Sequence, residues 1–187
     1  MINSDSSLCG EHATMLRMSL FARQLHQLPQ NELGGRRYSE ELDDALSVIC
    51  DICDVIHDAD LVDFVVSGFG QDAWPVDVRT DLAVVLGQIP DAISAIKHDE
   101  PFDLDFFEQG VERYLKFLPC ENRYTIQCTS LTDWLPNPPD GEMSKSDVKD
   151  LILGLAKQFV DIAEKVCPKL AVEPLFLGWT TQLRRLQ

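Results

Sequence analysis

The segment from Ser39 to Asp60 carries the pattern that most restricts how this chain can fold. On a helical wheel its apolar side chains gather on one side and its polar side chains on the other. The apolar side holds Leu42, Ala45, Leu46, Ile49, Ile52, Cys53 and Ile56, and the polar side holds Glu40, Asp43, Asp44, Ser47, Asp51, Asp54 and Asp58. We therefore predict an amphipathic helix over 40–58, capped by Ser39, that packs against a core.

Two cysteines of this helix have the spacing of redox and zinc sites. Cys50 and Cys53 form a CxxC pair, and His57 follows four residues after Cys53. A zinc site would need two further ligands from elsewhere in the chain, and a redox pair works best at a helix N-terminus, where the dipole lowers the thiol pKa. This pair lies in mid-helix among carboxylates, which raise that pKa. We favour packed cysteines, with a metal or redox role as alternatives.

The rest of the chain alternates between helical and strand patterns. Met15, Met18, Leu25 and Leu28 recur at helical spacing and predict a helix over roughly 11–28. Beyond the acidic helix, the sequence predicts a strand over 61–70, a helix from Asp77 to about Gln88 with another turn or two from Pro90, a strand over 102–107, a β-hairpin of 111–118 and 123–131, a proline-rich loop over 131–144, and a helix from Ser144 to about Val166.

A chain of 187 residues, 45% of them apolar, is long enough for one packed domain and short for two. We expect a single α+β domain over 1–187, with residues 1–10 flexible. Its antiparallel sheet of about four strands would be flanked by N-terminal helices and a long C-terminal helix. The sequence shows neither a secretory leader nor an apolar run of bilayer length, so we expect reduced cysteines and a cytoplasmic protein.

The net charge of −15 comes from one part of the chain. Residues 39–110 contain 18 acidic residues against two basic ones, Arg79 and Lys97, whereas 111–187 contain ten of each. The acidic region disfavours binding to nucleic acid phosphates and to anionic membranes, because both require basic surfaces. It favours a basic protein partner.

Motifs for catalysis are missing from the sequence. Gly68 and Gly70 lack the third glycine and the following helix of a dinucleotide loop, and neither a phosphate loop nor a GxSxG elbow occurs. We therefore predict no catalytic residue, no metal and no cofactor. One alternative is a metal-dependent enzyme, because Asp103 and Asp105 point to the same side of a strand and could hold a divalent ion together with a histidine. A scaffold or regulatory subunit is another.

Three tryptophans, Trp74, Trp134 and Trp179, lie in irregular contexts. For each of them we favour a position at the edge of the core. A tryptophan in a loop can also anchor a partner, and Trp134, in the proline-rich loop, is the candidate for that role.

Segments of the middle of the chain read FGQDAWPVDVRTDLAVVLGQIP, DFFEQGVER and QCTSLTDW. They resemble segments of small acidic immunity proteins found beside bacterial contact-dependent or secreted toxins, over roughly 64–135. The resemblance carries no catalytic motif. It implies a bacterial cytoplasmic protein that binds one cognate toxin and blocks it.

The resulting hypothesis is a non-enzymatic binding protein that neutralises a basic toxin by occluding its active or substrate-binding cleft. We expect folding to gather the acidic side chains of the central region into one continuous patch. The predicted partner-binding residues are Glu40, Asp43, Asp44, Asp51, Asp54, Asp58, Asp103, Asp105 and Trp134.

Overall fold

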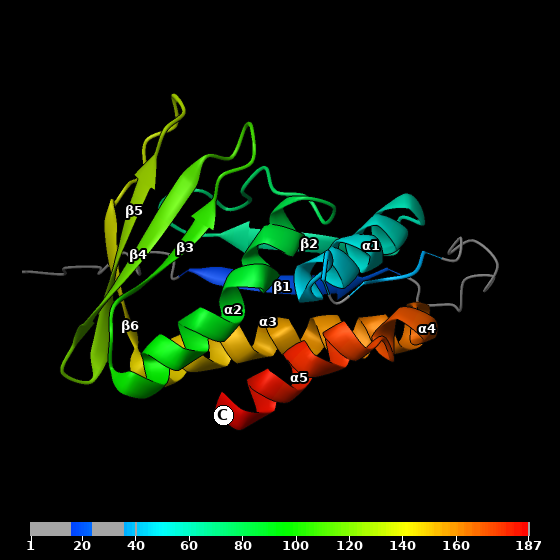
Figure 1. The fold of residues 1–187 in the computed structure, drawn as a ribbon. Coiled ribbons are helices and arrows are strands. Elements are labelled where there is room, and N and C mark those ends of the chain that lie inside the picture. Colours follow the sequence, from blue (N-terminus) through cyan, green and yellow to red (C-terminus); the bar gives the residue numbers. More distant parts are fainter. Residues whose placement is uncertain (1–15, 24–35, 40, 187) are drawn as a thin grey trace, which may run out of the picture.

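The structure, a computed structural model, describes residues 16–23, 36–39 and 41–186 (Figure 1). Its elements follow in the order β1 (Arg17–Ala22), α1 (Ala45–Asp58), β2 (Val62–Ser67), α2 (Asp81–His98), β3 (Phe102–Phe106), β4 (Arg113–Cys120), β5 (Arg123–Ser130), β6 (Asp140–Ser144), α3 (Lys145–Val166), α4 (Pro168–Ala171) and α5 (Pro174–Leu186). Antiparallel sheets combined with helices confirm the predicted α+β class. None of the described helices has the length and apolar character needed to cross a lipid bilayer.

A four-stranded antiparallel sheet, in the order β3-β4-β5-β6, forms one end of the molecule (Figure 1). Leu104 of β3 lies opposite Leu115 of β4, which lies opposite Cys128 of β5. All three are buried, and their strand neighbours alternate outward, so one face of the sheet packs on the core. The predicted strand and hairpin are confirmed. The fourth strand, β6, lies in the segment that the sequence assigned to a loop.

The helices extend the core away from this sheet. α3 begins where the sequence places it, because Oγ of Ser144 accepts a hydrogen bond from the Asp147 N–H at 3.0 Å. It runs along the molecule beside the two-stranded sheet of β1 and β2, and α5 lies next to it (Figure 1). α2 is the central element, because it packs against α1, α3, α5 and β3.

β1 is a strand where the sequence predicted part of a helix over 11–28. Met18 and Leu20 are buried, whereas Phe21 is 58% exposed, which is an alternation of period two. Leu20 lies opposite Phe64 of β2, and its N–H donates to Oε1 of Gln158 in α3 at 2.8 Å. Contacts distant in the sequence thus override the local helical spacing. Residues 11–15 and 24–28 of that predicted helix, and residues 1–10, lie outside the described residues.

α1 starts later than predicted, because Asp44 caps it and Ser39 does not. Oδ1 of Asp44 accepts from the Ser47 N–H at 3.0 Å, and the Ser47 hydroxyl accepts from the Asp44 N–H at 3.4 Å, which together form a capping box. The Ser39 carbonyl closes the preceding turn by accepting from the N–H groups of Leu42 and Asp43. Leu42, predicted on the buried face, is 87% exposed.

α2 is one helix that continues through Pro90, where the sequence predicted an interruption. The Asp77 carboxylate accepts from the Thr80 N–H at 2.7 Å and so fixes the turn before the helix. Proline removes one backbone donor from a helix. Here Pro90 is buried together with Ile89 and Ile93, and this packing offsets the loss.

Candidate protein-binding surface

One end of the acidic face of α1 is held by Arg36. Its Nη2 lies 2.8 Å from Oδ1 of Asp43, and its Nη1 lies 3.0 Å from Oδ1 of Asp51. Asp51 also accepts a hydrogen bond of 2.5 Å from the Tyr38 hydroxyl. The backbone N–H of Ser39 and the Arg36 guanidinium lower the pKa of Asp43. Asp43 is therefore ionised at neutral pH, and the two carboxylates share a single arginine.

The other end of this face is held by Arg79 in the same way. Its Nε lies 2.9 Å from Oδ1 of Asp54, and its Nη2 contacts Asp58. The arrangement recurs just beyond the helix, where one arginine again contacts two carboxylates: Arg23 with Asp60 and Asp63. In each cluster the arginine neutralises one of two charges, so each retains one negative charge.

The expected acidic patch is therefore paired in part with arginines of the same chain. Four of the predicted partner-binding residues, Asp43, Asp51, Asp54 and Asp58, form ion pairs within the chain. Asp44 stays outside these clusters and is exposed, although its carboxylate caps α1. Glu40 lies outside the described residues. Exposed ion pairs of this kind contribute little to stability, so a basic partner could compete for them.

Asp103 and Asp105 project from the same side of β3, as its period of two predicted, and alternate with buried Phe102, Leu104 and Phe106. Asp103 is exposed and lies opposite Lys116 in the strand register. Burial, with a smaller effect of Asp103, raises the pKa of Asp105. α2 lies between β3 and α1 (Figure 1), so the acidic strand does not extend the acidic face of α1. Within the described residues, no three His, Cys, Asp or Glu side chains are placed to hold a metal ion.

Trp134 is engaged within the protein. The guanidinium carbon of Arg113 lies 3.7 Å from the centre of its ring and 4.4 Å from that of Trp74. Arg113 is only 2% exposed, and its Nη2 donates to Oε1 of Gln71 at 2.6 Å. Its Nε and Nη1 have no hydrogen-bond partner in the part of the chain that the structure describes. The side chain beyond Trp134 that faces solvent is Leu135, which is 77% exposed. The predicted anchor is thus half of an internal cation–π sandwich.

Cys53 is completely buried in α1, and Cys50 is half-buried at the edge of the core, as the helical wheel predicted. Burial raises the pKa of both thiols, and for Cys50 the carboxylates of Asp54 and Asp51 raise it further. Both thiols are therefore weak nucleophiles near neutral pH. His57 is exposed.

Next to the capped end of α1 is a groove between three helices, which we call the α1–α2–α5 groove. It has a volume of about 490 Å³. Exposed apolar side chains stand at its mouth, with Phe107 at 53% and Leu46 at 38% exposure. Its lining consists of Asp44, Ala45, Leu46 and Ile49 from α1, Val84, Gly87, Gln88, Pro90 and Asp91 from α2, Phe107 after β3, and Trp179 and Gln182 from α5.

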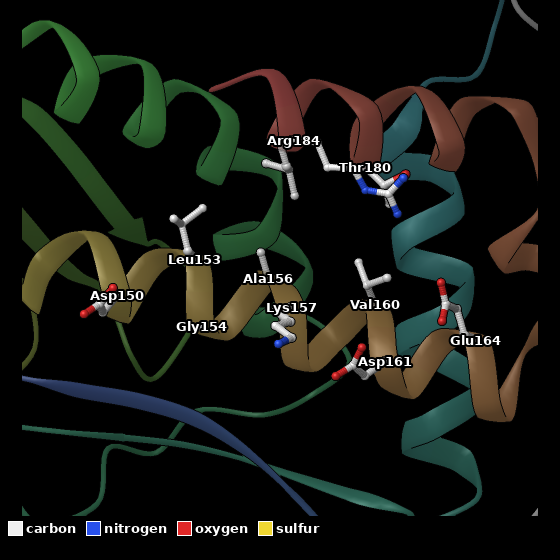
Figure 2. Close-up of a pocket in the computed structure, with 11 residues that line it drawn as sticks. Asp150, Leu153, Gly154, Ala156, Lys157, Val160, Asp161, Glu164, Thr180 and Arg184 are labelled. Atoms are coloured by element: carbon white, nitrogen blue, oxygen red, sulfur yellow. The ribbon is translucent and has the colours of Figure 1, made fainter. Parts of the chain in front are cut away.

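A second groove, the α3–α5 groove, has a volume of about 610 Å³. Leu153, Ala156 and Val160 point from α3 toward α5 (Figure 2). Its charged lining has both signs, with Asp150, Asp161, Glu164, Lys157 and Arg184. This groove does not select the charge of a ligand, whereas the described lining of the α1–α2–α5 groove contains carboxylates and no Lys, Arg or His.

Comparison of the chain with protein-family models, curated proteins and solved structures gives no match. The functional interpretation therefore depends on the geometry of the described residues.

Two important side chains were missed by the sequence reasoning, although both left a signal. Phe107 falls on the same alternating positions as Asp103 and Asp105, whose side chains point outward from β3. An aromatic residue at an outward position indicates an exposed apolar surface. Arg113 falls on the same alternating positions of β4 as Leu115 and Phe117, whose side chains are buried. An arginine at an inward position indicates a buried charge.

Proposed function

We propose that the protein is a non-enzymatic binding protein that captures a basic protein through the acidic surface around α1. The observation that carries this proposal is the ratio of two carboxylates to one arginine in the clusters of Arg36, Arg79 and Arg23. The arginines orient the carboxylates and cancel only half of their charge. An approaching cationic surface would meet fixed acceptors and a net negative field, which speeds association.

The resemblance in the segments over roughly 64–135 suggests the class of partner. A toxin that acts on nucleic acid presents a basic cleft for phosphate, and an acidic protein competes for the same charges. The proposed role is that of a cytoplasmic immunity protein that occludes the active or substrate-binding cleft of one cognate toxin. Asp103 and Asp105 lack a third ligand in the described part of the chain, so we do not extend the alternative of a metal-dependent enzyme.

Growth assays test this proposal. Each protein encoded beside this one would be expressed alone and together with it in the same bacterial cells. We expect one of these proteins to stop growth, co-expression to restore growth, and the two purified proteins to bind in calorimetry with an affinity that falls as salt rises. Absence of a growth-inhibiting neighbour, or inhibition that co-expression leaves unchanged, would refute the immunity role.

A further inference from the structure

The α1–α2–α5 groove combines an apolar mouth with an acidic rim. Asp44 and Asp91 are exposed on this rim, and Asp91 makes no ion pair with any residue that the structure describes. Among the residues that the structure describes, the groove lining contains no Lys, Arg or His that could neutralise this rim. An apolar pocket with an uncompensated negative rim is complementary to a group with an apolar stem and a cationic end.

The lining of the groove includes a buried tryptophan, Trp179. Trp179 is 4% exposed and stacks on Phe176, with ring centres 5.6 Å apart. Its buried Nε1–H has no acceptor among the described residues, whereas the Nε1–H of Trp74 donates to the Gly68 carbonyl at 3.2 Å. Buried indole N–H groups normally have a partner. Because this Nε1 is closed to solvent, Trp179 forms a buried wall of the groove, and its indole signal reports on occupancy of the groove.

The depth of the groove depends on Gly87. A Cβ atom at this position would lie 3.3 Å from Cδ1 of Leu46, so the missing side chain keeps the space between α1 and α2 open. Glycine is unfavourable in the middle of a helix. The backbone of Gly87 lies in a regular part of α2, so no unusual backbone angle requires a glycine here.

We infer that this groove binds a segment of a protein partner in which a lysine or arginine adjoins an apolar side chain. The apolar side chain would pack between Leu46 and Phe107, and the cation would pair with Asp44 and Asp91. The inference rests on the proposed function in that the partner is basic, and it adds where and by which chemistry the partner binds.

The binding test uses two blocked peptides, acetyl-Arg-Leu-Arg-Leu-amide and acetyl-Glu-Leu-Glu-Leu-amide, titrated into the full chain labelled with nitrogen-15. The spectrum contains one indole signal for each tryptophan, and Trp179→Phe identifies the signal of Trp179. We expect the cationic peptide to shift that signal saturably at about millimolar concentration, where weak ligands bind. The acidic peptide should leave it in place. An unmoved Trp179 signal, or equal shifts with both peptides, would overturn the inference.

Substitutions at two glycines separate loss of the groove from loss of the fold. Gly87→Ala narrows the α1–α2–α5 groove, whereas Gly154→Ala, also in mid-helix, lines the α3–α5 groove and has nothing within 4 Å of its added Cβ. Both variants should retain the melting temperature of the wild type or exceed it, because alanine favours a helix. We expect only Gly87→Ala to weaken binding of the cationic peptide. Equal affinities in the two variants would place the peptide elsewhere.

The acidic rim is tested by a matched pair of charge reversals. Asp91→Lys changes the rim, and Asp133→Lys makes the same change at an exposed position outside the groove. We expect Asp91→Lys to weaken binding of the cationic peptide by about two- to fivefold, the range typical of exposed ion pairs. Asp133→Lys should weaken its binding less. Equal weakening by both would show that only net charge matters and would overturn the groove as the site. A toxin still neutralised by Gly87→Ala and Asp91→Lys would reject the groove and leave the proposed function standing.

Discussion

The side-chain amide of Gln88 pairs with the backbone of Asp105 in both directions. Nε2 of Gln88 donates to the Asp105 carbonyl at 2.9 Å, and Oε1 accepts from the Asp105 N–H at 2.8 Å. β3 is an edge strand, and exposed edges tend to pair with other chains. A helix side chain therefore takes the place of a neighbouring strand and joins α2 to the sheet.

Gln88→Ala should destabilise the protein by about 1–3 kcal/mol, because it leaves two backbone groups of a partly covered edge without partners. The measurement is the free energy of unfolding in urea. Gln127→Ala, at an exposed position of β5, is the control and should change that free energy by less than about 0.5 kcal/mol. Equal effects of the two substitutions would show that the pairing with Asp105 adds no stability.

Trp134→Ala should cost about 2 kcal/mol or more, because it removes one face of the sandwich around buried Arg113 and leaves the guanidinium less covered. Leu135→Ala changes the adjacent residue, which is 77% exposed, and should cost less than about 0.5 kcal/mol. Unfolding in urea compares the two variants. If Trp134 were instead a partner anchor with no internal role, its removal would leave stability unchanged.

Asp81 predicts a pH dependence of stability. Burial, assisted by the nearby carboxylates of Asp77 and Glu108, raises the pKa of Asp81 from 3.8 to about 6. Below pH 3.8 the carboxyl is protonated in both folded and unfolded chains and has no effect. Between 3.8 and about 6 the unfolded chain loses the proton first, so stability falls as pH rises, by up to about 3 kcal/mol above pH 6.

Asp81→Asn should therefore stabilise the protein above pH 6 and have little effect near pH 4, since the amide oxygen can still accept from the Asp77 N–H. Urea unfolding of both proteins at intervals from pH 4 to about pH 8 measures the difference. A difference that is constant over this range would mean that the ionised carboxylate of Asp81 is tolerated in the fold.

The fold was predictable where local signals were sufficient. The alternation around Leu104 and Leu115 and the cap at Ser144 depend on neighbouring residues, and the sheet and α3 follow from them. β1 was not predictable in the same way, because its pairing partner Phe64 and the acceptor Gln158 are distant in the sequence. Such contacts decide whether a short segment, whose apolar residues fit both a helical and a strand period, forms a helix or a strand.

The candidate surface, like the fold, was predictable from the sequence only in part. The wheel placed the carboxylates of α1 on one face, but the arginines that bridge them, Arg36 and Arg79, come from segments on either side of the helix. No periodicity indicates which cation will fold back onto which carboxylate. The groove is still harder to predict from the sequence, because Leu46, Gly87 and Trp179 come together only when three helices pack.

Removal of Arg79 should speed capture of the toxin identified by the growth assay. Arg79→Ala frees Asp54 and Asp58, adds one negative charge to the face of α1, and should cost less than about 1 kcal/mol in stability because these ion pairs are exposed. We expect the association rate at about 50 mM NaCl to rise by about twofold or more, and the gain to shrink at about 300 mM NaCl, where screening is stronger. Stopped-flow fluorescence measures both rates. Arg123→Ala is the control, because it removes another exposed arginine from its ion pair with Glu142 on the four-stranded sheet, away from α1. A larger or equal gain in the control would mean that net charge, and not the surface around α1, governs capture.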